Sequence, residues 1–238
     1  MISISELNIA NETHPIWVWL PGWSFSATIF KPLYSQLAGK HLLVDYCATT
    51  SMDEIVISLA ELAPDNAIWC GWSLGGALAQ RVCADKQHKG LVTLGTGKRF
   101  IGADPSSWGM PEQDFATFNA AFEAAPAKTL KRFNSLVTQG STNPRNLMRV
   151  LAEHQQQPSA ELSDTLNWLS YDALTSDNQP DPKTIHIYGQ ADALNPGGLV
   201  PQTLSPGSSH VFFLEDSGRE HLLQKLLKIA DSQEEKNA

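Results

Sequence analysis

The feature of this sequence that most restricts its fold is a regular alternation of short apolar runs with helical patterns. The strand-like runs cover residues 2–10, 16–20, 41–46, 67–72 and 90–95, and the helical patterns between them cover 28–39, 51–63 and 74–85. Strands that alternate with helices indicate a mostly parallel sheet with helices on both faces. The pattern therefore predicts an α/β fold.

The alternation stops after residue 97 and resumes near residue 180. Between these points we find four helical patterns separated by Pro126, Gly140 and Pro158, and no convincing strand. Predicted strands at 184–192 and 210–216 and a helix at 220–230 then follow. The simplest organisation is one α/β core, residues 1–97 and 180–238, with a helical cap inserted at 98–179.

Composition excludes several classes of protein. The chain has 238 residues, 42% hydrophobic and 18% charged, as expected of a globular protein. Its net charge of −8 argues against nucleic-acid binding. We find no signal peptide or membrane span, so we expect a cytoplasmic protein. We also expect it to be a monomer. The three cysteines have no metal-ligand spacing, so neither a metal site nor disulfides are expected.

One short motif points to chemistry. The sequence Gly71-Trp72-Ser73-Leu74-Gly75 lies where a predicted buried strand meets a helix. A G-x-S-x-G turn in this context holds the serine at a sharp bend with its hydroxyl exposed above the sheet, where it can act as a nucleophile. The alternative is a serine in a tight turn that caps the following helix.

A serine hydroxyl needs a base, and the base needs an acid to orient it. In such folds the acid and then the histidine follow the serine along the chain. Asp192 closes a predicted strand and is our candidate acid, with Asp45, Glu215 and Asp216 as competitors. Five histidines follow the serine: His88, His154, His186, His210 and His221. We expect His221 to be the base because it follows the predicted strand 210–216 at the carboxyl edge of the sheet. His186 and His210 fall within or at the start of predicted strands, where packing explains them.

The attacked carbonyl becomes an oxyanion, which needs hydrogen-bond donors in place. We expect the backbone N–H groups of Leu74 and Trp23 to supply them, the second from the loop after the strand 16–20. Apolar side chains near these donors are expected to bind the substrate: Trp23, Phe25, Trp72 and Leu74.

These stretches resemble the α/β-hydrolase superfamily over essentially the whole chain. Within it, "DNAIWCGWSLGGALAQ", the run from "GLVTLGTGKRF" to "KRFNSLVTQG" and "YGQADALNP" are similar to the pimeloyl-[acyl-carrier-protein] methyl ester carboxylesterases of biotin synthesis. The resemblance implies a Ser73–Asp192–His221 triad, Trp23 and Leu74 as oxyanion donors, and Trp72 as a wall of the acyl pocket. Pro21 stands where the family usually has histidine.

Charge is uneven along the inserted segment. Residues 124–152 carry five basic side chains and no acidic one: Lys128, Lys131, Arg132, Arg145 and Arg149. Their i, i+3 and i, i+4 spacing places like charges on one helix face, which favours an anionic partner. Acyl carrier proteins are acidic, and the resemblance implies such a partner here. The alternative is an ordinary solvated face.

These features together predict a serine carboxylesterase without cofactor that hydrolyses the methyl ester of an acyl chain on acyl carrier protein. The triad alone also fits a small-ester esterase, a thioesterase or a carbon–carbon lyase. A non-catalytic binding protein with this fold is a further alternative.

Overall fold

A computed structural model describes residues 2–10, 14–47, 51–97, 99–102, 109–171, 181–194 and 203–231. Its main sheet has seven strands, and β1 pairs antiparallel with β3 while every other pair is parallel. In spatial order the strands are β1 (Ile2–Ile9), β3 (Gly39–Tyr46), β2 (Ile16–Leu20), β4 (Ile68–Trp72), β5 (Gly90–Leu94), β8 (Thr184–Gly189) and β9 (Thr203–Ser205). The predicted mostly parallel α/β sheet is therefore confirmed.

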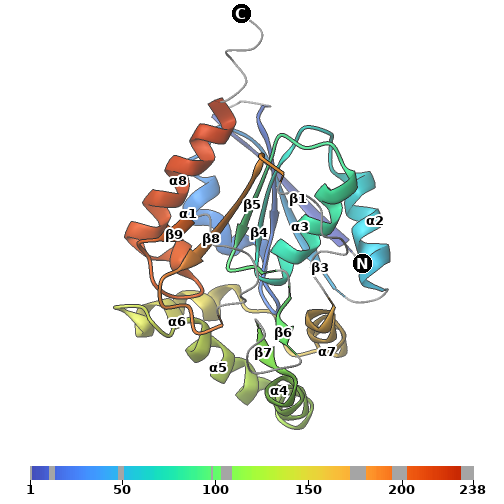
Figure 1. The fold of residues 1–238 in the computed structure, drawn as a ribbon, viewed down its shortest axis with the longest axis vertical. Helices are drawn as coiled ribbons and strands as arrows, with labels where there is room; N and C mark the ends of the chain where they lie inside the picture. Colours follow the sequence, from blue (N-terminus) through green and yellow to red (C-terminus); the bar gives the residue numbers. More distant parts are fainter. Residues whose placement is uncertain are drawn as a thin grey trace, which may run out of the picture.

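Helices cover both faces of this sheet (Figure 1). Helices α1 (Lys31–Tyr34) and α8 (Asp216–Asp231) lie on one face, and α2 (Met52–Leu62) and α3 (Leu74–Asp85) lie on the other. The Ser51 and Glu54 side chains cap α2 reciprocally, as their spacing indicates. The helix predicted at 28–39 is shorter in the structure, where a 3₁₀ turn, η1 (Ala27–Phe30), precedes α1 and the chain turns into β3 at Gly39.

In its described residues, the segment between β5 and β8 contains four α-helices at one end of the sheet (Figure 1): α4 (Glu112–Ala124), α5 (Pro126–Val137), α6 (Pro144–His154) and α7 (Ala160–Asn167). It also contains two short strands, β6 (Ile101–Gly102) and β7 (Met110–Pro111), which the sequence did not predict because two residues are too few to show a period. The proposed domain boundaries fall at residues 98 and 172–180, outside the described residues.

The strand predicted at 210–216 is wrong. The edge strand of this region is β9, and residues 212–214 form a 3₁₀ turn, η3 (Phe212–Leu214), before α8 begins at Asp216. Phe212 and Phe213 are both fully buried, and Phe213 packs against Phe30 and Trp72. A short apolar run does not distinguish a buried strand from a buried turn, which is why the pattern misled.

The strand order explains where a site can form. From β2 the chain crosses to β3 on one side and then returns to β4 on the other, so β2 and β4 are neighbours with Leu20 paired to Gly71. Loops that leave the two strands diverge at this point, and ligands bind in the crevice between them. Among the helices that the structure describes, none has the length and apolar character needed to span a membrane.

Candidate active site

Ser73 lies at the sharp turn between β4 and α3. Its backbone has φ 53° and ψ −119°, a conformation that costs free energy for a residue with a side chain. The close packing of this turn requires its glycines: a Cβ on Gly71 would lie 2.5 Å from the Gly75 carbonyl oxygen, and one on Gly75 would lie 2.2 Å from that of Leu20. The Ser73 side chain makes no capping hydrogen bond to α3, so the capping alternative is not what the structure contains.

The structure brings His210 to Asp192. The Nδ1 atom of His210 lies 2.7 Å from Oδ2 of Asp192, and the two side chains are 1% and 0% exposed. The other carboxylate oxygen, Oδ1, accepts from the Leu194 N–H at 2.8 Å. The Nε2 atom of His210 is buried and has no hydrogen-bond partner in the described structure. The Asp192 carboxylate thus fixes the ring with Nε2 available to a reacting group.

The structure does not place His221 in this pair: the imidazole that contacts Asp192 belongs to His210, so the predicted pairing of Asp192 with His221 is wrong. His221 lies in the second turn of α8, half-buried. Burial and the nearby Lys225 lower its pKa. The reason is topological: β9 pairs with β8, Gly189 opposite Ser205, so the turn that follows β9 comes beside the loop that follows β8. That turn carries His210, whereas His221 follows the turn into a helix on the outer face.

A sequence signal for His210 exists. The turn-forming residues Pro206-Gly207-Ser208-Ser209 directly precede it, which indicates a loop position rather than the start of a strand. Two side chains hold this turn. Glu215 accepts from the Ser209 N–H at 2.9 Å and from its hydroxyl at 2.6 Å, and the Trp72 indole N–H donates to the His210 carbonyl oxygen at 3.1 Å.

The competing acids have other contacts in the structure. Glu215 holds the turn before His210, as described above. Asp45, at the end of β3, accepts from the Ala27 N–H at 2.6 Å and from the Ser26 hydroxyl at 3.2 Å. Asp216 is an exposed partner of Arg219 on α8. Asp192 is the carboxylate that contacts an imidazole beside the serine.

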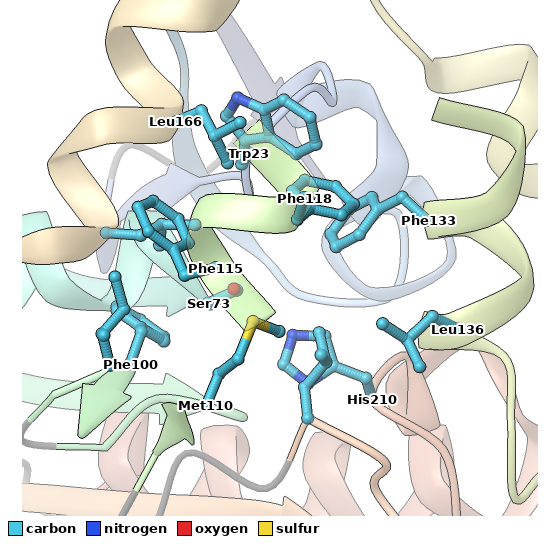
Figure 2. A pocket seen from close by; sticks show the side chains of 13 residues that line it. Trp23, Ser73, Phe100, Met110, Phe115, Phe118, Phe133, Leu136, Leu166 and His210 are labelled. Carbon is cyan, nitrogen blue, oxygen red and sulfur yellow. The ribbon is translucent and has the colours of Figure 1, made fainter. Parts of the chain in front are cut away.

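An apolar cavity connects Ser73 and His210 to the inserted helices (Figure 2). Figure 2 shows Ser73 and His210 among the apolar side chains of the lining, with Trp23, Phe118 and Phe133 grouped on one side. The remaining lining is hydrophobic: Trp23, Phe100, Ile101, Met110, Phe115, Phe118, Phe133, Leu136, Leu166, Leu169 and Leu194. Such a lining suits an aliphatic chain and excludes water from the reacting atoms.

Of the four predicted substrate contacts, Trp23 lines the cavity and the other three do not. Phe25, Trp72 and Leu74 are 1% exposed or less and pack behind the wall. The Trp72 ring lies between the rings of Phe25 and Phe213, with centroids 5.1 and 5.3 Å away, because its indole is needed to hold the His210 turn. The sequence placed these three residues near the site, but it did not indicate that their side chains point into the core and not into the cavity.

The predicted oxyanion donors lie on the two elements that meet at Ser73. Leu74 is the first residue of α3, where a backbone N–H has no partner within the helix. Trp23 follows β2, and its loop is firmly held: the Tyr46 hydroxyl donates to the Pro21 carbonyl oxygen at 2.7 Å, and the Trp23 indole donates to that of Leu162 at 2.8 Å. Their role as donors stays a prediction.

The five basic residues of the insertion are exposed on α5 and α6: Lys128, Lys131, Arg132, Arg145 and Arg149. Within the described ranges none of them forms an ion pair. Arg132 borders a surface groove between α4 and α5 that shares four lining residues with the cavity: Met110, Phe118, Phe133 and Leu136. Of the five basic residues, Arg132 is thus the one that borders a groove adjoining the cavity.

The sequence is similar to those of known esterases and biotin-synthesis proteins. The chain is 30% identical over 216 residues to a pimeloyl-[acyl-carrier protein] methyl ester esterase from Sodalis glossinidius, covering 82% of this chain and 83% of that protein. The corresponding protein of Shewanella oneidensis is 28% identical over 220 residues, with 83% and 80% covered. A biotin biosynthesis bifunctional protein from Saccharophagus degradans is 28% identical over 210 residues, which are 79% of this chain but only 38% of that protein.

Solved structures agree on the fold. An esterase from Exiguobacterium antarcticum superposes with a TM-score of 0.74 at 16% identity, covering 96% of this chain and 95% of that one. A bromoperoxidase from Bacillus anthracis gives 0.72 at 16% identity, with 96% and 94% covered. No protein-family model matches the chain.

Proposed function

Because the chain belongs to the family of pimeloyl-[acyl-carrier protein] methyl ester esterases, and is a carboxylic ester hydrolase of the α/β-hydrolase fold, we propose that it hydrolyses a methyl ester at the end of an acyl chain held on acyl carrier protein. The observation that carries this proposal is the His210–Asp192 pair beside Ser73, at the wall of a cavity otherwise lined by apolar side chains.

In the proposed mechanism, Ser73 Oγ attacks the ester carbonyl while His210 Nε2 accepts its proton. The Asp192 carboxylate stabilises the imidazolium that results. The N–H groups of Trp23 and Leu74 stabilise the oxyanion. His210 then protonates the leaving methoxide, so methanol departs, and the same residue activates a water that hydrolyses the acyl-enzyme to the free acid.

The cavity supports an acyl substrate. Aromatic rings from the β2 loop, α4 and α5 line its interior, with the Trp23 ring 5.8 and 5.1 Å from those of Phe118 and Phe133. Burial of each methylene of a chain in such a lining stabilises the complex by about 0.8 kcal/mol. An extended aliphatic chain is therefore the substrate class that this cavity favours.

The exposed cations on α5 and α6 support a carrier-bound substrate. Like charges spaced by one turn on a helix repel, so a binding partner with acidic groups relieves this repulsion. The groove beside Arg132 lies next to the cavity, which suits a carrier that docks outside and extends its acyl arm inward.

The first experiment tests the catalytic proposal. Wild type is expected to release methanol from the monomethyl ester of a pimeloyl chain held as a thioester on acyl carrier protein, and to be labelled at Ser73 by a fluorophosphonate. Ser73→Ala should do neither while its circular dichroism and Tm stay those of wild type. A wild-type protein that is folded but neither turns over esters nor reacts with the probe would contradict the proposal.

The second experiment tests the carrier surface. Arg145→Glu/Arg149→Glu is expected to lower kcat/KM for the carrier-bound ester by about tenfold at low salt, with less effect at high salt, because steering by charge is screened. Activity on p-nitrophenyl butyrate should change by less than about twofold. Lys225→Glu/Lys228→Glu on α8 is the matched control. Equal losses on both substrates would argue against docking at this face.

A further inference from the structure

The inserted segment is bonded directly to the loop that follows β2. Residues 154–156, which begin at the last residue of α6, run antiparallel to residues 24–26 of this loop. The Ser26 N–H donates to the His154 carbonyl oxygen at 2.9 Å, and the Gln156 N–H donates to the Ser24 carbonyl oxygen at 2.8 Å. The side-chain Nε2 of Gln156 also donates to the Phe25 carbonyl oxygen at 3.1 Å. Phe25 and Gln155 form a β-bridge. This is a strand-like contact between the cap and the loop that carries Trp23.

A pair of amides anchors the cap side of this contact. Asn134 of α5 donates from Nδ2 to Oε1 of Gln155 at 3.0 Å, and Gln155 donates from Nε2 to Oδ1 of Asn134 at 3.1 Å. The Asn134 side chain is buried, and both of its polar atoms are used within the pair. The two hydrogen bonds fix the middle residue of 154–156 relative to α5.

The loop itself needs external support. Its turn closes with the Phe25 N–H donating to the Gly22 carbonyl oxygen at 3.2 Å, and Ser24 has φ 70°, a region that side-chain-bearing residues rarely occupy. The Ser24 hydroxyl is buried without a hydrogen-bond partner in the described structure, so it does not stabilise the turn. Such a conformation persists where surrounding contacts hold it.

We propose that Gln155, anchored by Asn134, is a positioning residue that sets the direction of the Trp23 backbone N–H toward the oxyanion. The inference rests on the proposed function, which makes that N–H a donor. A hydrogen bond weakens steeply as its angle departs from linear. The oxyanion exists only in the transition state, so a tilted donor lowers kcat and leaves substrate binding nearly unchanged.

The test uses three variants and p-nitrophenyl butyrate as substrate. Gln155→Ala and Asn134→Ala are each expected to lower kcat about tenfold, less than the 10² to 10³ of a lost donor, with KM within about twofold. The Ki of an alkyl boronic acid, which mimics the tetrahedral intermediate, should rise in parallel. Asn134→Gln/Gln155→Asn, which keeps the combined reach of the two amides, should restore most of the activity.

Asn119→Ala is the matched control. It removes another amide pair of the cap, Asn119 Nδ2 to Asn167 Oδ1 at 2.7 Å between α4 and α7, and neither of these two amides bonds to residues 22–26. This variant should lose stability but keep kcat. Gln155→Met replaces Gln155→Ala if the latter does not fold.

Two results would overturn the positioning role while the proposed function stands. The first is an active wild type whose Gln155 variants keep kcat and the boronate Ki. The second is a fall in kcat of the Gln155 variants that Asn119→Ala matches when its Tm is lowered to the same value. Failure of the proposed function is recognised separately, because wild type itself would then be inactive.

Discussion

At the scale of single residues, the site depends on a buried carboxylate that has one imidazole as its partner. Asp192 and His210 are both removed from water, and burial of an unpaired charge is costly, so each stabilises the other in one orientation. Oδ1 of Asp192 is held by the Leu194 N–H, which leaves Oδ2 for the ring. His210 Nδ1–H therefore donates to the carboxylate, and Nε2 is the basic atom.

We predict that His210→Gln and His221→Gln separate the two candidate bases. His210→Gln should lower kcat/KM for a p-nitrophenyl ester by about 10³-fold or more, because no other group then accepts the Ser73 proton. His221→Gln should stay within about twofold of wild type. Steady-state kinetics of both purified variants checks this, and the reverse order of effects would restore His221 as the base.

At the scale of elements, two short turns bring Ser73 and His210 to the same cavity. The turn after β4 is forced by glycines at which any side chain would meet backbone. The turn after β9 is held instead by polar contacts, chiefly from Glu215 to Ser208 and Ser209. Gly95, after β5, packs on the His210 ring, where an added Cβ would lie 2.8 Å from Cε1.

We predict that Glu215→Gln weakens catalysis without removing any catalytic group. The amide replaces one acceptor oxygen with a donor, so it cannot accept from both Ser208 and Ser209, and the turn that carries His210 loosens. We expect kcat to fall about tenfold, since one or two hydrogen bonds to a charged acceptor are lost. Asp216→Asn, at the exposed neighbouring position, is the control, and an equal kcat in the two variants would contradict this role.

At the scale of the whole molecule, two buried histidines make hydrogen bonds within the core, and burial lowers the pKa of each. His186 on β8 contacts the Thr93 hydroxyl on β5 at 2.6 Å, and burial lowers its pKa from 6.5 to about 4. His41 accepts from the Trp19 indole at 3.1 Å, and burial lowers its pKa as well. The unfolded chain binds these protons at a higher pH than the folded one does. Their contribution to stability is complete above the ordinary pKa and is lost as the pH falls.

We predict that His186→Asn, which can keep the hydrogen bond to Thr93, makes stability less dependent on pH. Between pH 7 and pH 5 the free energy of unfolding of wild type should fall by about 2 kcal/mol more than that of the variant. The reason is that a proton bound only by the unfolded chain lowers stability by about 1.4 kcal/mol for each pH unit below the ordinary pKa. Urea unfolding followed by tryptophan fluorescence at both pH values measures this. Parallel losses in the two proteins would show that His186 does not titrate in this range.

The sequence alone determined the features that depend on local pattern. The period of apolar residues predicted β2, β3, β4 and β5 and the helices α2 and α3, and the four helical patterns of the insertion correspond to α4–α7. The spacing of glycines around Ser73 predicted a strand-to-helix bend, because close packing at such a bend has no other solution. The same local reasoning placed Asp192 at the carboxyl end of a strand, and in the structure it lies in the turn just after β8.

The tertiary structure alone decided which side chains meet. His210 directly precedes the apolar run 211–214 and His221 follows it, and only the pairing of β9 with β8 brings the first of them to Asp192. The direction of Trp72 and Phe25, away from the cavity, depends on rings contributed by distant elements. Contacts between residues far apart in the chain depend on the packing of whole elements, and a local pattern carries no record of that packing.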